Sequence, residues 1–321
     1  MDLACSATEP YLPHLSAMLH SALSHTPERP FRVWLIHGEP LSETGCANVK
    51  SVVEGLGAEF NLLQVTDDML DGFRNRNFNI SCWYRILLPQ LVPHLDRVIY
   101  LDADIIVTDS LRPLWQTELE GHLLGAVSNP LYGYMPNWPR DRLGIEKPED
   151  YPNTGVLLMD LSAMRKQNFI GQLRDYARQH PENLLPEQDA VAALLKGEWL
   201  HLHPRWNMQS VIFDTRPEQQ PFSSDVLKEA LCSPAIVHYC GCHKPWHYLG
   251  YHQHNDLYFQ HLDQTPWPRQ PLMYDSLIYR MLGLLPLELQ FRIIEKRGGW
   301  RRLVNRIRHL LGKRIEQKST A

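Results

Sequence analysis

The stretch from Arg97 to Asp109, RVIYLDADIIVTD, places two carboxylates inside a run of apolar residues. Such a run is typical of a buried strand, where a carboxylate is costly unless a positive or hydrogen-bonding group meets it. On an extended chain, residues i and i+2 point to the same side, so Asp102 and Asp104 are spaced to reach one cation. Mg²⁺ and Mn²⁺ take carboxylate oxygens and often complete their shell with substrate phosphates. The stretch therefore favours a metal-diphosphate site.

Three interpretations of this D-x-D stretch remain open at this point. A solvated turn that ends a strand is the ordinary alternative, because such short motifs recur by chance. Dehalogenase-like phosphatases use the first Asp as nucleophile and carry Thr or Val where this chain has Ile106. Nucleotide-sugar glycosyltransferases use the pair to hold a metal. The rest of the chain has to decide among them.

Strand-like and helical segments alternate around this stretch. This pattern predicts an α/β fold with a mostly parallel sheet and helices on both faces, in which ligands bind at the carboxyl ends of the strands. The predicted strands span residues 3–5, 31–36, 59–65, 97–109, 123–127, 155–159, 199–203 and 235–239. The predicted helices span residues 11–24, 42–56, 81–91, 169–179 and 187–195.

Composition and charge narrow the class of protein. The 321 residues carry a formal net charge of -4, which gives no overall attraction to nucleic acid. The first ten residues, MDLACSATEP, do not resemble a secretory signal, and no window of about 18 apolar residues could span a membrane. We therefore expect a cytoplasmic protein without disulfides, with one catalytic domain over residues 1–265 and a helical, basic tail over residues 266–321.

A second motif, IVHYCGCHKPW, covers Ile236 to Trp246. His238 ends an apolar strand, where a third metal ligand would be expected beside carboxylates. Gly241 permits close backbone approach, and Lys244 supplies a point charge suited to a diphosphate. A phosphatase would instead need an acidic pair after its Lys. The Cys240-x-Cys242 spacing is a weak signal for zinc.

Four further groups of residues are ambiguous when taken singly. Asn153 and Thr154 precede a predicted strand, where a plain turn is the simpler explanation. Glu187, Gln188 and Asp189 open a predicted helix, where acids usually complement the helix dipole. A lone Arg85 is most often an ion-pair residue, although its guanidinium fork suits a sugar phosphate. Tyr11 is suited equally to stacking on a base and to a place in the core.

Five motifs in this order resemble the retaining glycosyltransferases of family 8, above all the bacterial galactosyl- and glucosyltransferases that build lipopolysaccharide cores. The motifs are ISCWYRILLPQL, LDRVIYLDADIIVTDSLRPLW, YPNTGVLLMDL, EQDAVAALLKGEW and VHYCGCHKPWH. The resemblance implies a GT-A fold, Mn²⁺ or Mg²⁺ as cofactor, and a UDP-glucose or UDP-galactose donor. It implies Asp102, Asp104 and His238 as metal ligands. It further implies as donor-binding residues Ala7, Thr8, Tyr11, Arg85, Asp102, Ala103, Asp104, Asn153, Thr154, Glu187, Gln188, Gly241 and Lys244.

The sequence departs from the family pattern at two of these positions. Relatives carry Asp where Thr8 and Glu187 stand, which affects uridine recognition and the identity of the sugar, respectively. Gln188 matches the position proposed to face the anomeric carbon, and no carboxylate other than neighbouring Asp189 offers itself as nucleophile. The resemblance therefore favours front-face attack by the acceptor hydroxyl over a covalent intermediate on Asp189.

The tail from Phe291 onward combines a basic face with apolar residues at helical spacing. That pattern is typical of a helix in an anionic membrane interface, and a helix packed on protein is the alternative. We expect a saccharide or glycolipid acceptor, membrane contact at the cytoplasmic face of the inner membrane, and no nucleic-acid partner. The alternatives to a hexosyltransferase are a dehalogenase-type phosphatase and a membrane-recruited binding protein with a decayed transferase site.

Overall fold

The computed structural model describes residues 1–73, 79–130, 138–183, 185–214, 220–241, 244–250 and 252–285. The chain forms two compact units. The larger unit consists of residues 1–245 and 251–270, and the smaller unit consists of residues 246–250 and the chain from residue 271 onward. The domain boundary at residues 265/266 and the basic tail remain predictions, because the tail from Phe291 lies outside the described residues.

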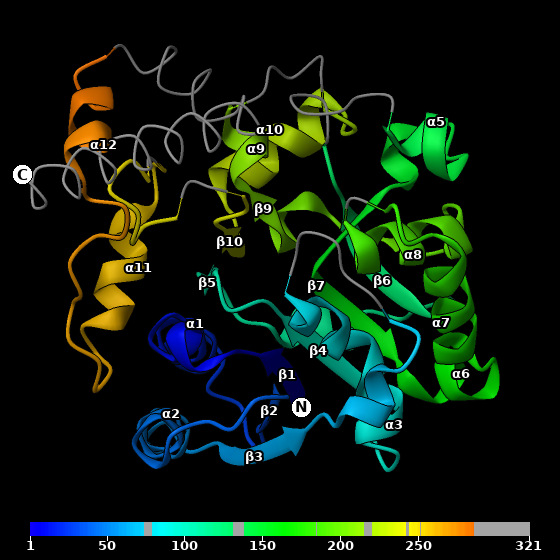
Figure 1. Ribbon diagram of the computed structural model, residues 1–321, viewed down its shortest axis with the longest axis horizontal. Coiled ribbons are helices and arrows are strands. Elements are labelled where there is room, and N and C mark those ends of the chain that lie inside the picture. The colour runs from blue at the N-terminus through cyan, green and yellow to red at the C-terminus, as the bar shows by residue number, and fades with distance from the viewer. Residues whose placement is uncertain are drawn as a thin grey trace, which may run out of the picture. The chain divides into compact units, whose positions relative to one another are not determined.

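A seven-stranded sheet forms the centre of the larger unit (Figure 1). Its strand order is β3-β2-β1-β4-β7-β6-β8. The pairs β1–β2, β2–β3, β1–β4 and β6–β8 are parallel, and only β7 runs antiparallel to its neighbours β4 and β6. The strands are β1 (Asp2–Ser6), β2 (Arg32–His37), β3 (Glu59–Gln64), β4 (Arg97–Leu101), β6 (Leu124–Ser128), β7 (Pro152–Asp160) and β8 (Leu200–His201). The sheet confirms the predicted α/β class.

Alternate residues of the central strands pack into two cores on opposite faces of this sheet. In β4, Ile99 and Leu101 belong to one core, and Val98 and Tyr100 belong to the other. The first core is covered by α1 (Leu12–His25) and α2 (Glu43–Gly55). The second is covered by α3 (Leu88–Leu91), α6 (Leu161–Lys166), α7 (Phe169–Gln179) and α8 (Pro186–Leu195).

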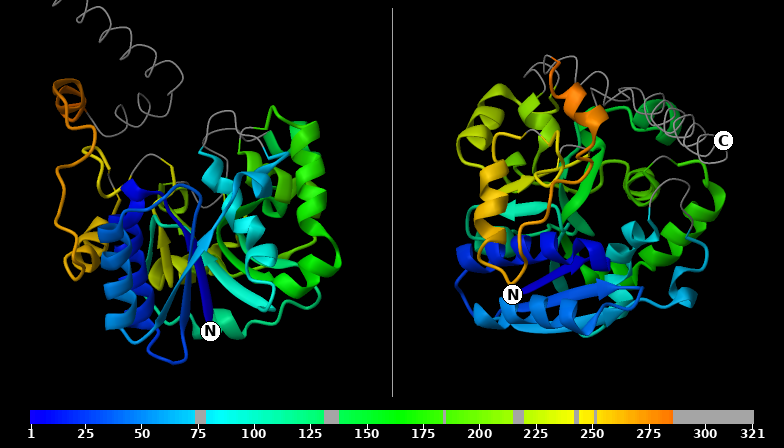
Figure 2. Two further views of the ribbon diagram at one scale, coloured as in Figure 1. Left: turned by 60° about the horizontal axis from the view of Figure 1, so that its bottom comes forward. Right: turned by 60° about the vertical axis from the view of Figure 1, so that its left-hand side comes forward.

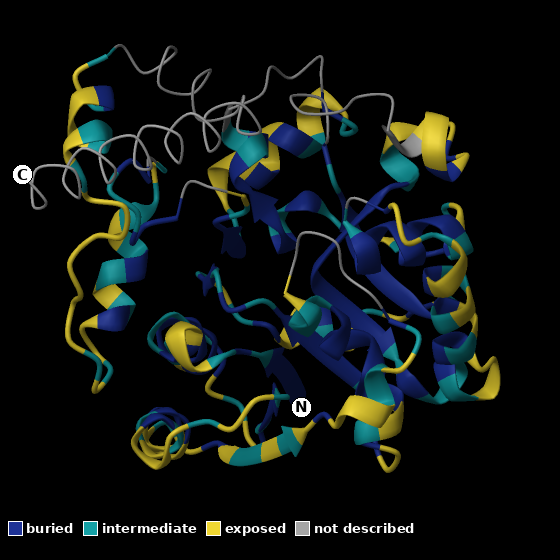
Figure 3. Ribbon diagram, in the orientation of Figure 1, coloured by how far each residue is buried: buried dark blue, intermediate teal, exposed yellow. Residues whose placement is uncertain are grey.

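The two groups of helices lie on opposite sides of the strands in the left-hand view of Figure 2. The inner strands β1, β2, β4, β6 and β7 are mostly buried, the edge strands β3 and β8 are partly exposed, and the outward helix faces are exposed (Figure 3). Near-continuous apolar runs in strands follow from this burial on both faces.

A second, three-stranded sheet has the order β5-β10-β9. Its strands are β5 (Ile105–Val107), β9 (Met208–Gln209) and β10 (Ile236–His238). The stretch at residues 97–109 is therefore two strands in two sheets, and not one continuous strand as the apolar run predicts. The chain leaves the large sheet after Leu101 and enters the small one at Ile105, which places Asp102 and Asp104 at the junction.

The remaining elements are short. The predicted helix over residues 81–91 is a 3₁₀ helix, η3, followed by α3; Pro89 lies in the first turn of α3 and its ring has no N–H to donate. The 3₁₀ helices among the described residues are η1 (Glu9–Tyr11), η2 (Asp67–Leu70), η3 (Ile80–Leu87), η4 (Pro148–Asp150) and η5 (Pro204–Trp206). The other α-helices are α4 (Arg112–Gln116), α5 (Trp138–Leu143), α9 (Ser210–Asp214), α10 (Ser224–Cys232), α11 (Asn255–Leu262) and α12 (Leu277–Leu282).

The described part of the smaller unit pairs His247 with Met273 and contains α12. Three apolar side chains, Leu277, Met281 and Leu284, are exposed at i, i+4 and i+7 spacing on and just after this helix. Within the described ranges, no helix has both the length and the apolar character needed to cross a membrane.

Candidate active site

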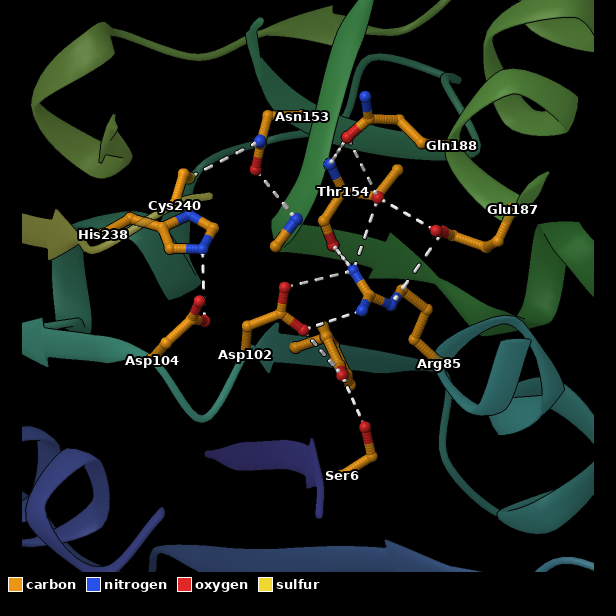
Figure 4. Close-up of polar contacts among 12 residues, drawn as sticks. Ser6, Arg85, Asp102, Asp104, Asn153, Thr154, Glu187, Gln188, His238 and Cys240 are labelled. Carbon is orange, nitrogen blue, oxygen red and sulfur yellow. Dashed lines mark hydrogen bonds and ion pairs between the residues drawn. The ribbon is translucent and has the colours of Figure 1, made fainter. Parts of the chain in front are cut away.

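Three residues that could bind a cation meet at the junction of the two sheets. Asp102 follows β4, Asp104 precedes β5, and His238 ends β10, which pairs with β5 (Figure 4). One ligand atom from each residue lies within 4.8 Å of the other two. Among the described residues this is the only group of three or more such side chains. Asp102 and Asp104 do not lie on one extended strand as predicted, because they occupy the connection between β4 and β5, where their carboxylates still lie close together.

Asp102 is held in place from the large sheet. Arg85 Nη2 lies 2.8 Å from Asp102 Oδ1, and Arg85 Nη1 donates to Oδ2 at 3.4 Å and to the Thr154 carbonyl at 2.6 Å. Tyr100 donates its hydroxyl hydrogen to Asp102 Oδ1 at 3.0 Å, and its oxygen lies 2.8 Å from Ser6 Oγ. The Arg85 guanidinium also stacks over the Tyr100 ring, 4.7 Å from its centroid. Arg85 therefore positions a metal-ligand candidate in addition to facing the site.

Asp104 is paired with two cationic groups. Its Oδ1 lies 3.3 Å from His238 Nε2, and its Oδ2 accepts a hydrogen bond from Lys244 Nζ. Lys244 also donates to the Tyr239 carbonyl at 2.5 Å. Burial alone would raise the pKa of Asp104, but Lys244 and His238 hold that pKa well below its ordinary value. The site thus stabilises a full negative charge on this carboxylate.

The carboxylate of Asp104 also affects the pKa values of Lys244 and His238. Burial lowers the pKa of Lys244, but nearby Asp104, with smaller contributions that include Tyr11, raises it overall. Burial likewise opposes the charge on His238, while Cys240 and Asp104 raise the pKa of its imidazole to about 10. The negative charge of Asp104 therefore favours positive charge on both neighbouring side chains.

Gly155 on β7 gives His238 the space it occupies. A Cβ at position 155 would lie 2.2 Å from His238 Cε1 and 2.8 Å from Asp102 Oδ2. The imidazole ring therefore packs directly on the backbone of β7, which is possible only with glycine at this position. A glycine inside a strand pattern is a known signal for such close approach.

The face of the site beside β7 carries the residues predicted to hold a sugar. Thr154 Oγ1 donates to Glu187 Oε2 at 3.0 Å, and the Thr154 N–H donates to Gln188 Oε1 at 3.3 Å. Arg85 Nε lies 3.9 Å from Glu187 Oε1. Burial raises the pKa of Glu187 to about 7, in spite of the opposing effect of Arg85.

Asp189 is buried away from this face. It is 0% exposed, and its carboxylate accepts hydrogen bonds from the Tyr151 hydroxyl at 2.6 Å and from the Leu185 N–H at 3.1 Å. Each carboxylate oxygen therefore has a donor within the fold, and these two contacts hold the side chain in the interior.

The remaining predicted donor-binding residues lie at loops and helix starts. Thr8 is the N-cap of η1, and Tyr11 at the end of η1 is 40% exposed with its ring edge-on to His14. Ala7 and Ala103 are buried. Gly241 has φ of +71°, in the left-handed region, with no atom within 4 Å of where a Cβ would lie.

Sequence reasoning missed several residues that build the site. Tyr100 on β4 lies two residues before Asp102, which directly follows this strand, so its i/i+2 relation was a usable signal. Gly155 was also readable as a glycine in a strand. Asn207 contacts His238 Nδ1 at 2.9 Å, and Tyr151 contacts Asp189, but neither has a local sequence signal.

The fold and the carboxylate pair at its strand ends define a GT-A glycosyltransferase. The model of glycosyl transferase family 8 matches residues 2–250, and the chain belongs to this family. General stress protein A of Bacillus subtilis (strain 168) is 27% identical over 278 residues, which cover 83% of this chain and 94% of that protein. Glycosyltransferase GlyF of Streptococcus pneumoniae serotype 4 (strain ATCC BAA-334 / TIGR4) is 23% identical over 266 residues, or 82% of this chain and 61% of that one.

Solved structures share this fold. A crystal structure of galactosyltransferase LgtC in complex with donor and acceptor sugar analogs superposes with a TM-score of 0.74 at 23% identity, covering 88% of this chain and 99% of that chain. The apo structure of the bifunctional glycosyltransferase WbbM gives a TM-score of 0.66 at 17% identity, covering 83% and 50% of the two chains. The likeness confirms the predicted fold.

Proposed function

We propose that this glycosyltransferase moves a hexose, glucose or galactose, from a UDP-sugar to a saccharide acceptor with retention of configuration. The observation that carries the proposal is the meeting of Asp102, Asp104 and His238 at the junction of two sheets, with Lys244 and Arg85 beside them. A phosphatase of the dehalogenase type does not belong to this family. An assay of UDP release distinguishes an active transferase from a binding protein with a decayed site.

The donor set fits a divalent cation such as Mn²⁺ or Mg²⁺. Two carboxylates and one imidazole present ligand atoms within 4.8 Å of one another, and Gly155 leaves the space that the imidazole needs. Hard cations prefer such oxygen-rich sets, and imidazole suits the Mn²⁺ end of the series. When bound, the cation would neutralise charge on the leaving diphosphate.

Different residues of the chain would contact the diphosphate, the sugar and the uridine of the donor. Lys244 would exchange its bond to Asp104 for the diphosphate, next to the open backbone at Gly241. The sugar would contact Arg85, Asn153, Thr154, Glu187 and Gln188. The uridine would lie against Ala7, Thr8, Tyr11 and Ala103, with the exposed Tyr11 ring available to stack on the base.

Retention would proceed by front-face attack of the acceptor hydroxyl. The two hydrogen bonds that hold Asp189 support this choice, because a nucleophilic Asp189 would first have to leave the donors Tyr151 and Leu185. Gln188 Oε1 faces the Thr154 N–H at 3.3 Å, which fixes its amide beside the predicted sugar position.

The acceptor would be a lipopolysaccharide core or another lipid-linked glycan at the cytoplasmic face of the inner membrane. The exposed apolar side chains Leu277, Met281 and Leu284 support membrane contact, together with the basic, apolar-patterned sequence from Phe291. This contact would be peripheral, through amphipathic and electrostatic attraction to anionic lipids.

Release of UDP from a panel of UDP-sugars, with Mn²⁺ and with a chelator, tests the activity. We expect metal-dependent release from UDP-glucose or UDP-galactose, lost at least about 100-fold in Asp104→Asn. Asp109→Asn is the matched control, since Asp109 ends the same motif but pairs with Arg205 at 2.6 Å outside the site. Absence of turnover with every nucleotide sugar, despite binding of UDP, would indicate a decayed site.

Flotation with anionic and neutral lipid vesicles tests the membrane contact. The full chain should float with anionic vesicles only, and deletion of residues 291–321 should abolish flotation while UDP-sugar hydrolysis persists. Equal flotation of the deleted chain would contradict a role for the tail.

A further inference from the structure

Buried polar side chains behind the cation-ligand group form a chain of hydrogen bonds that ends on His238. The backbone N–H of Gly155 donates to Asn153 Oδ1 at 3.0 Å, and Asn207 Nδ2 donates to the same oxygen at 2.9 Å. Asn207 Oδ1 lies 2.9 Å from His238 Nδ1. Asn207 is 0% exposed, so these protein groups are its partners in place of bulk water.

The backbone N–H of Gly155, at one end of this series of hydrogen bonds, fixes the donor and the acceptor in each of them. A backbone N–H only donates, so the Asn153 atom that faces it must be the amide oxygen. The Asn207 atom that faces this oxygen must be its NH₂ group, and the other Asn207 atom, which faces His238, must be its oxygen. An oxygen only accepts here, so His238 Nδ1 carries a hydrogen whether the imidazole is neutral or protonated.

Asn207 is well placed to impose this arrangement. It follows η5 and precedes β9, and its own N–H donates to the Pro204 carbonyl at 2.9 Å. The next strand residues continue into the small sheet, where Gln209 of β9 lies opposite His238 of β10. The backbone on both sides of the Asn207–His238 contact is therefore fixed by neighbouring strands.

We propose that Asn207 is a positioning residue for cation binding: it keeps the hydrogen of His238 on Nδ1 and so directs Nε2, which lies 3.3 Å from Asp104 Oδ1, to the cation. The inference rests on the proposed metal-dependent function. Metal-bound histidines commonly donate their second ring N–H to such a partner, and loss of that partner weakens metal binding about 10- to 100-fold.

Mn²⁺ alone, without nucleotide, is the probe. Electron paramagnetic resonance of free Mn²⁺ gives the affinity, and spin-echo modulation from a directly bound nitrogen shows whether imidazole ligates the ion. Wild-type protein should show the nitrogen signature. Asn207→Leu removes the acceptor and should bind Mn²⁺ about 10- to 100-fold more weakly with the signature lost. Asn207→Asp keeps an oxygen opposite Nδ1–H and should keep the signature.

Gln209→Leu is the matched control, because it replaces a buried amide on the neighbouring strand whose Nε2 donates to the Ser128 carbonyl at 3.0 Å. It should bind Mn²⁺ with the wild-type affinity and signature. Thermal unfolding confirms that each variant is folded, and Asn207→Ala replaces Asn207→Leu if the latter does not fold.

The outcomes separate this inference from the function on which it rests. A folded Asn207→Leu with wild-type affinity and nitrogen signature overturns the positioning role and leaves the metal site intact. Loss of the signature in Asn207→Asp to the same extent as in Asn207→Leu also overturns it, because the acceptor is then not what matters. Wild-type protein that binds no Mn²⁺ overturns the metal site itself and this inference with it.

Discussion

Alanine at position 155 adds one methyl group at the most crowded point of the site. Its Cβ would lie 2.2 Å from His238 Cε1, 2.8 Å from Asp102 Oδ2 and 3.0 Å from His238 Nδ1. Carbon atoms pack at about 3.5 to 4.0 Å, so the imidazole must retreat by roughly 1.3 Å or β7 must bend. Movement of the ring would disturb the contact of His238 Nδ1 with Asn207 Oδ1 at 2.9 Å.

The expected cost of Gly155→Ala has two parts. Overpacking a well-filled interior costs about 1 to 3 kcal/mol of the free energy of unfolding. Displacement of a ligand by about 1 Å costs on the order of 100-fold in turnover. The backbone of Gly155 itself lies outside the left-handed region, so the loss arises from the added carbon and not from backbone strain.

Urea unfolding, Mn²⁺ affinity and UDP-sugar hydrolysis measure these effects together. Gly55→Ala is the matched control, because position 55 lies at the end of α2 with no atom within 4 Å of a new Cβ. It should leave activity unchanged and stability equal or up to about 1 kcal/mol higher. A Gly155→Ala variant with wild-type stability and Mn²⁺ affinity would refute the close packing of His238 on β7.

Three further substitutions test the surroundings of the site. Glu187→Gln should flatten the pH dependence of stability: the pKa of Glu187 is raised by burial to about 7, so its stabilising effect is full below its ordinary value of 4.5 and is lost as the pH rises through 7. Urea unfolding in chelator between pH 4.5 and 7.5 should show a slope for wild type that the variant lacks, amounting to at most about 3 kcal/mol, and equal slopes would contradict it. Arg85→Lys keeps the charge but cannot bond both Asp102 oxygens and the Thr154 carbonyl, so the free energy of unfolding should fall by about 1 to 3 kcal/mol, and no change would show that the fork is dispensable. Tyr151→Phe removes a donor from buried Asp189 and should lower the free energy of unfolding by about 1 to 3 kcal/mol. An unchanged free energy of unfolding would mean that other groups hold Asp189.

The periodicity of the sequence predicts where most strands lie but not which sheet each strand joins. Ile105, Ile106 and Val107 continue the apolar run of β4, and apart from Arg97 both segments are buried, so nothing local distinguishes them. Their separation depends on β10, which pairs with β5 from far along the chain. The alternation of apolar residues along a strand does not reveal such long-range strand pairing.

Some residues of the candidate site are predictable from the sequence and others are not, because local patterns do not reveal contacts between distant segments. Asp102 and Asp104 stand out because acids in an apolar run need an explanation. Lys244 stands out by its motif, but its bond to Asp104 joins distant segments and appears only in the structure. Asn207 has no local signal, because its role consists of hydrogen bonds to residues on two other strands.

Because the three candidate ligands come from two different sheets, cation binding at this site would also couple folding to the supply of divalent cations. Asp102 and Asp104 meet His238 only when β10 has paired with β5, so the unfolded chain contains no assembled site. A cation that binds only the native state raises the free energy of unfolding by RT ln(1 + [M]/Kd), about 2.7 kcal/mol at one hundred times Kd. Cation availability would then set the amount of folded enzyme as well as its rate of turnover, and depletion would expose the protein to proteolysis before any substrate is involved.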